Sequence, residues 1–293
     1  MSRPFRTARL AVLIGFALSV RFCAAGEPGL FASLPRHSAI AGGADIAALR
    51  SHRQCAPFFA DLPDGGAPGL NEIVCSCDRV GNRNTVLCRF LSSAAVDDLH
   101  RRYADRLSPA EYAGDIPVHW FGGKPDGSDK VRMARLGADT VAVYSHYPKK
   151  GAFTVDRRGV PAALRRFVPQ RSGVLIWGAG LPGFTDPPLD AIRSFFFVLE
   201  PDVDGKLVIH GEVICINRAK ASFLRLSMPG ALSVLLGSRY GIPAPVTMAA
   251  VSALGIRQED AALRFSSDDV RPVLQLLSRI IRQQLSAGET AEK

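Results

Sequence analysis

Residues 73–90 read IVCSCDRVGNRNTVLCRF. Ile and Cys occupy every second position along 73–77, and Val, Cys and Phe do so along 86–90, which is the pattern of two β-strands with one apolar face each. The pair Gly81-Asn82 between them is a typical turn sequence. Apolar residues then recur every three or four positions, which indicates one face of a helix, at Val96, Leu99, Tyr103 and Leu107. The sequence therefore predicts a β-hairpin followed by a helix.

The same unit recurs along the rest of the chain. Paired strand-like runs are predicted within 131–146, 195–216 and 251–265, and each pair is followed by a stretch with helical periodicity. Proline at position 229 is expected to break or kink the third of these helices, because it removes a backbone donor. The predicted fold class is α+β, with mostly antiparallel sheets, helices packed on one face, and repeated hairpin-plus-helix units.

One extra strand-like run precedes each pair of units, at 38–42 and at 173–177. Both runs lead into similar turns of small residues. We therefore expect an internal duplication, with one α+β half over 26–170 and a second over 171–286. Residues 287–293 are expected to form a flexible C-terminal tail.

The first residues have the three parts of a secretory signal. Arg3, Arg6 and Arg9 form a basic head, residues 10–20 are apolar, and Cys23-Ala24-Ala25 supplies small residues at a cleavage site. The apolar run is shorter than the roughly 20 residues that a spanning helix needs. We expect residues 1–25 to be removed and the mature protein to be extracytoplasmic: periplasmic, secreted or associated with the cell envelope.

Charge and hydropathy argue against nucleic-acid binding and against an integral membrane segment. The formal net charge is +9, and removing the four arginines of the signal leaves +5. A mild excess spread along the chain is not the footprint of a nucleic-acid-binding protein. The other apolar stretches are too short or too charged to cross a bilayer, so a soluble mature product without an integral membrane segment is expected.

Residues 174–183 carry the most conspicuous motif, VLIWGAGLPG. A strand followed by G-x-G-x-x-G, with Glu200 ending the next apolar run, resembles the dinucleotide-binding fingerprint of flavin and nicotinamide enzymes. That site requires a helix beginning at the glycines, and Pro182 with Pro187-Pro188 opposes such a helix. We favour a turn at the end of a strand, and expect no cofactor.

Three cysteines share one face of the first hairpin. If Gly81-Asn82 is a two-residue turn, Cys75 lies directly opposite Cys88, and a cross-strand disulfide is conceivable; a one-residue shift of the turn centre brings Cys77 there instead. The face is apolar throughout, so plain burial of the thiols is the favoured interpretation. The cysteine and histidine spacings match no metal-binding motif, and no metal site is expected.

The best candidate for an exposed functional loop contains His119, Trp120 and Lys124, because it combines aromatic and turn residues between two structured units. The alternative, which we favour, is that the Trp packs on the sheet edge. The histidines are scattered, and no serine or cysteine has the frame of a known nucleophile. No catalytic residue can therefore be assigned.

These observations favour an exported, non-catalytic binding or envelope-associated protein that contacts a protein or small-molecule ligand. The alternative is an extracytoplasmic hydrolase whose site is assembled from distant segments. A dinucleotide-binding oxidoreductase is a remote third hypothesis. Whether the chain is an enzyme stays open at this point, since its sequence resembles no characterised family.

Overall fold

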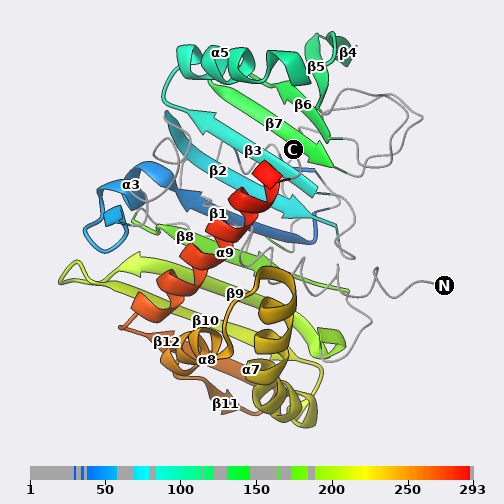
Figure 1. Cartoon of the computed structure of the whole chain (residues 1–293). Helices are drawn as coiled ribbons and strands as arrows, with labels where there is room; N and C mark the ends of the chain where they lie inside the picture. The colour runs from blue at the N-terminus through cyan, green and yellow to red at the C-terminus, as the bar shows by residue number, and fades with distance from the viewer. Residues whose placement is uncertain are drawn as a thin grey trace.

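A computed structural model describes residues 30, 34–35, 38–57, 69–78, 84–113, 115–121, 131–145, 164, 173–183 and 189–290. Within them the chain forms one open antiparallel sheet of 12 strands, accompanied by five α-helices (Figure 1). The predicted α+β class and antiparallel pairing are confirmed. The predicted signal segment and residues 291–293 of the predicted tail lie outside the described residues. Most of the helical stretch predicted to follow the strands of 131–146, near 161–168, lies outside them as well.

The strands and helices have the following bounds. The strands are β1 Ile40–Asp45, β2 Leu70–Cys77, β3 Asn84–Phe90, β4 Glu111–Ala113, β5 Ile116–Phe121, β6 Val131–Arg135, β7 Thr140–Ser145, β8 Ile176–Gly180, β9 Ile192–Pro201, β10 Leu207–Cys215, β11 Arg257–Glu259 and β12 Ala262–Ser267. The α-helices are α3 Ile46–Ser51, α5 Ser93–Arg102, α7 Arg218–Tyr240, α8 Ala244–Ala253 and α9 Arg271–Thr290.

The strand order is β11-β12-β10-β9-β8-β1-β2-β3-β7-β6-β5-β4. β1 and β8 pair at the centre, so the two halves of the chain share one continuous sheet instead of forming separate ones. Read outward from this pair, the order is β1, β2, β3, β7, β6, β5, β4 on one side and β8, β9, β10, β12, β11 on the other, so the first side has two more strands. This order is consistent with the expected duplication, which stays a prediction. The edge strands β4 and β11 have only three residues each, and short edges discourage pairing with another chain.

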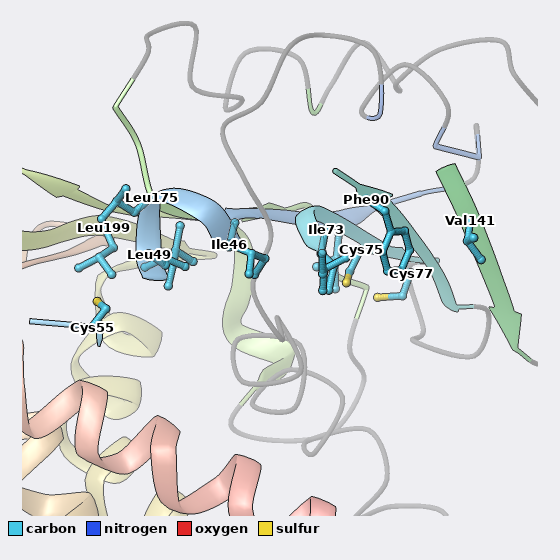
Figure 2. Close-up of a cluster of buried hydrophobic side chains, with 14 of the residues drawn as sticks. Ile46, Leu49, Cys55, Ile73, Cys75, Cys77, Phe90, Val141, Leu175 and Leu199 are labelled. Atoms are coloured by element: carbon cyan, nitrogen blue, oxygen red, sulfur yellow. The ribbon is translucent and has the colours of Figure 1, made fainter. Parts of the chain in front are cut away.

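Side chains alternate between the two faces of the sheet, as the hairpin pattern predicts. Ile73, Cys75 and Cys77 belong to a core cluster that also receives Val96 of α5 and Val270 before α9. Figure 2 shows this cluster on the side of the sheet where α9 lies. The opposite face holds a second cluster, which includes Val74, Leu87, Trp177 and the buried Leu164.

Helix α5 begins where the sequence predicts. The Ser92 side chain caps it by accepting a hydrogen bond from the Ala95 N–H at 3.3 Å. Val96 is its fully buried residue. The predicted continuation of the α-helix to Leu107 is wrong, because Ala104–Arg106 form a separate 3-10 turn.

Helix α7 continues through Pro229, so the expected break is not found. The two halves of this helix are held by different cores. Before Pro229, Ala221 and Leu224 pack with Cys215 and Leu263 of the sheet. After it, the helix packs against α8 and α9 in a helical cluster of Leu236, Tyr240, Ile242, Ala250, Leu276 and Ile280.

Two local predictions are wrong. Residues 251–256 were expected to form a strand, but Val251 to Ala253 are the last residues of α8, and the final hairpin is β11–β12. The expected loop around His119 and Trp120 is the β4–β5 hairpin, since β5 extends to Phe121. Both segments are short and lack a clear period, which makes strand, helix and loop difficult to distinguish.

Candidate functional site

The glycines of the dinucleotide-like motif lie inside a strand. Gly178 and Gly180 belong to β8, which is paired with β1 on one side and β9 on the other. Gly178 faces Phe197 and Gly180 faces Phe195. A Cβ atom at Gly180 would lie 2.6 Å from Phe195 Cε1, and one at Gly178 would approach the Phe197 ring still more closely.

These glycines therefore make room for aromatic rings. A phosphate-binding loop needs free backbone amides at a helix N-terminus, whereas these residues lie in a ladder and residues 181–183 after them are not helical. The dinucleotide interpretation of this motif is wrong. The pairing of a glycine with an aromatic residue on the neighbouring strand recurs at Gly43 with Trp177 and at Gly211 with Phe265.

The register of the first hairpin differs from the predicted one. Cys75 faces Val86 and Cys88 faces Ile73, so the expected direct opposition of Cys75 and Cys88 is wrong. The two strands are offset by two residues from the register that a turn centred on Gly81-Asn82 would give. Neither thiol forms a disulfide in this structure.

Burial makes the Cys77 and Cys88 thiols poor nucleophiles. It raises the pKa of Cys88 to about 12, with a further contribution from Cys75. It also raises the pKa of Cys77 strongly, assisted by Asp78 and Cys75. Only the thiolate reacts or ligates, so this cluster is apolar core at neutral pH, as the favoured interpretation predicts.

Trp120 packs on the edge of the sheet. Its indole Nε1–H donates to Glu111 Oε1 at 3.0 Å, and the guanidinium carbon of Arg132 lies 4.2 Å from the ring centroid. Arg132 is itself buried. Trp120 thus covers a buried cation and joins β4, β5 and β6. Lys124, the third residue predicted for this loop, lies outside the described residues.

Among the described residues, the structure places His119 in β5 and His210 in β10, on two different parts of the sheet. His119 Nδ1 lies 2.9 Å from the Ser108 carbonyl oxygen, and His210 Nδ1 lies 3.8 Å from Glu200 Oε1. The hydroxyl of Ser108 donates to the Pro109 carbonyl and accepts from the Trp120 N–H. His146 lies outside the described residues.

The described residues contain no group of three or more His, Cys, Asp or Glu side chains that could hold a metal ion. None of the helices found there is both long and apolar enough to cross a membrane.

Sequence reasoning missed an apolar surface on α7. Phe223, Leu226 and Val234 are 52%, 77% and 73% exposed. Residues three, four, seven or eight positions apart in a helix share a side, so these three form one row, which we call the α7 row. The opposite side of the helix is buried through Leu224 and Leu235.

The charges of α7 all have one sign. The helix contains Arg218, Lys220, Arg225 and Arg239, and no acidic residue. Arg225 is exposed, and Lys220 is paired with Asp190 at 2.9 Å. Residues 226–238 carry no charge at all. That uncharged run, apolar on both sides of a helix, is the sequence signal that could have revealed the surface. Figure 1 shows α7 at the β11–β12 end of the sheet.

Comparison with known proteins does not assign the chain to a family. No protein-family model matches it, and no curated protein matches its sequence. Among solved structures, crystal form I of TP0453 is 8% identical, covers 88% of this chain and 99% of its own, and has a TM-score of 0.44. Crystal form IV of TP0453 is 6% identical, covers 85% and 96%, and has a TM-score of 0.47. Function must therefore be argued from the residues of this chain.

Proposed function

We propose that the chain is an exported, non-catalytic protein of the cell envelope that docks through α7 on the anionic surface of a membrane. The observation that carries the proposal is the α7 row on a helix that contains four cationic residues, of which Lys220 is paired with Asp190, and no acid. The sequence predicts an association with the cell envelope. The proposal assigns that association to one helix, α7, and to one kind of surface, an anionic membrane.

Burial of apolar side chains and electrostatic attraction would act together at such a surface. Single exposed apolar residues are ordinary on proteins, but the α7 row gathers a Phe, a Leu and a Val on one side of one helix. Helices that lie in a membrane interface combine large apolar residues with Lys and Arg. Each cation near an anionic leaflet adds about 1 kcal/mol of attraction. Neither contribution is large alone, so binding should need both.

The location of the row supports docking without unfolding. Leu224 and Leu236 hold the inner side of α7 in the sheet core and the helical cluster, respectively, while the row is exposed. The protein can therefore contact a surface with its cores intact. A peripheral contact of this kind requires no spanning segment.

Three observations support a binding role over a catalytic one. Burial keeps the Cys77 and Cys88 thiols protonated. The glycines of the nucleotide-like motif are covered by Phe195 and Phe197. Trp120 is held by Glu111 and lies over Arg132.

Two finer statements belong to the same proposal. Residues 1–25 direct export and are removed, so that α7 meets a membrane from the extracytoplasmic side. The two halves, 26–170 and 171–286, arose by internal duplication, an idea supported by the matching order of strands on the two sides of β1 and β8.

The test is cosedimentation of the mature protein with lipid vesicles. We expect binding to vesicles of phosphatidylglycerol and phosphatidylcholine, weak binding to phosphatidylcholine alone, and at least a tenfold loss of affinity in the double variant Phe223→Ser, Leu226→Ser. Val203→Ser is the matched control, since Val203 is fully exposed but lies in the β9–β10 turn. Equal binding by the double variant, or no binding to anionic vesicles, would rule out the proposal.

A further inference from the structure

Two histidines from different elements meet between α5 and the sheet. His100 lies in the last turn of α5 and His119 lies in β5. Their ring centroids are 5.8 Å apart, and the ring planes make an angle of 67°. The sequence separates the two residues by 19 positions, and only the fold places them side by side.

The hydrogen bonds of the two rings fix their neutral tautomers. His100 Nδ1 lies 3.0 Å from the Val96 carbonyl oxygen, and His119 Nδ1 lies 2.9 Å from the Ser108 carbonyl oxygen. A carbonyl oxygen can only accept, so each Nδ1 must carry the hydrogen. The lone pair of each neutral ring is therefore on Nε2.

This arrangement is the one found around metal-binding histidines. Such histidines nearly always donate the hydrogen of the second ring nitrogen to a carbonyl or carboxylate, which orients the ring and raises the basicity of the ligating nitrogen. Two imidazoles on one tetrahedral ion, each bound at about 2 Å, would have centroids about 5 Å apart. The observed centroid separation, 5.8 Å, is slightly longer than that distance.

We propose that His100 and His119 form a two-histidine site for a divalent transition-metal ion, bound through both Nε2 atoms. Imidazole nitrogen suits Zn²⁺, Cu²⁺, Ni²⁺ and Co²⁺. The described residues supply no cluster of three or more ligands, so water fills the remaining positions and the site is open. Arg101 and Arg102 lie beside His100 in α5, but both bond to Asp98, at 3.5 and 2.9 Å, which offsets their charge.

The site is independent of membrane docking, because α5 and β5 lie at the other end of the sheet from α7 (Figure 1). A protein that binds metal but not vesicles would keep this inference and remove the proposed function. A protein that binds vesicles but not metal would keep the proposed function and remove this inference.

The test is titration of the mature protein with Co²⁺, followed by its visible absorption. We expect one saturable site with the spectrum of nitrogen and oxygen ligands, and at least a tenfold loss of affinity in His100→Ala and in His119→Ala. His210→Ala is the matched control, since His210 lies on β10 and should bind Co²⁺ as the wild type does. Absence of saturable absorption, equal affinity in the variants, or a sulfur-to-cobalt charge-transfer band from the cysteines would overturn the proposal.

A second measurement covers the case in which a histidine variant does not fold. Electron paramagnetic resonance of the wild-type protein with one equivalent of Cu²⁺ should show coupling to two imidazole nitrogens. A spectrum without nitrogen coupling would overturn the proposal as firmly as an unaffected variant.

Discussion

Gly178 of β8 lies directly opposite Phe197 of β9, and the Phe197 ring occupies the space that a side chain at position 178 would need. Gly180 and Phe195 repeat the arrangement two residue pairs further along the same two strands. A glycine opposite an aromatic residue lets the ring lie across the strand, which pins the register of the two strands. The glycines that suggest a nucleotide site in the sequence are thus elements of the core.

The substitution Gly178→Ala should therefore destabilise the protein by about 1 to 3 kcal/mol, the usual cost of overpacking a core. The measurement is the free energy of unfolding in urea. Gly230→Ala is the matched control, because nothing lies within 4 Å of the added Cβ and the residue is inside α7. Alanine there should stabilise the helix by up to about 1 kcal/mol. Equal effects of the two substitutions would contradict the role given to Phe197.

The buried thiols make stability fall at high pH. Burial raises the pKa of Cys55 to about 11 and that of Cys88 to about 12, from an ordinary value of 9.0. Above about pH 9 the unfolded chain loses these protons while the folded protein keeps them, so the free energy of unfolding should decrease between about pH 9 and 12. Urea unfolding at several pH values measures this decrease.

Cys88→Ala should make the decrease shallower. Alkylation of the native mature protein at pH 8, followed by mass spectrometry, should leave Cys77 and Cys88 unmodified, and unfolding should expose both to the reagent. A disulfide between Cys75 and Cys88 in the purified protein would contradict the register described for β2 and β3.

Trp120 should behave as a structural residue. Trp120→Phe keeps a ring over Arg132 and loses the hydrogen bond to Glu111, so a cost of about 1 kcal/mol is expected. Trp120→Ala also uncovers the Arg132 side chain and leaves a cavity, and about 3 kcal/mol is expected. Thermal or urea unfolding of the two variants provides the comparison. A ligand-binding role would instead leave stability unchanged in both.

The local sequence patterns were sufficient to predict the class of fold and several of its strands and helices. The alternation along 73–77 and 86–90 and the helical period after Ser93 predict β2, β3 and α5 correctly, because each depends on neighbours within one unit. The glycine pairs could not be predicted in this way. Gly43 and Trp177 are far apart in the sequence, and only the central pairing of β1 with β8 brings them together.

Helix α8 and the α7 row were missed for a different reason. Residues 240–256 carry no charge, so polarity gives no period that would separate a helix from a strand. The apolar residues of α7 surround the helix, and the sequence alone does not say which of them remain exposed. The pair His100 and His119 also depends on packing between α5 and β5, and neither residue belongs to a recognisable motif.

Docking of α7 on an anionic membrane is tested most directly by a fluorescent probe placed in the α7 row. An environment-sensitive dye would be attached to Leu226→Cys and, as the control, to Val203→Cys in the β9–β10 turn, with the buried native thiols checked for labelling in the parent protein. On addition of phosphatidylglycerol vesicles, the emission of the dye at position 226 should shift to the blue and that at 203 should not. An unchanged spectrum at 226, or equal shifts at both positions, would contradict docking through α7.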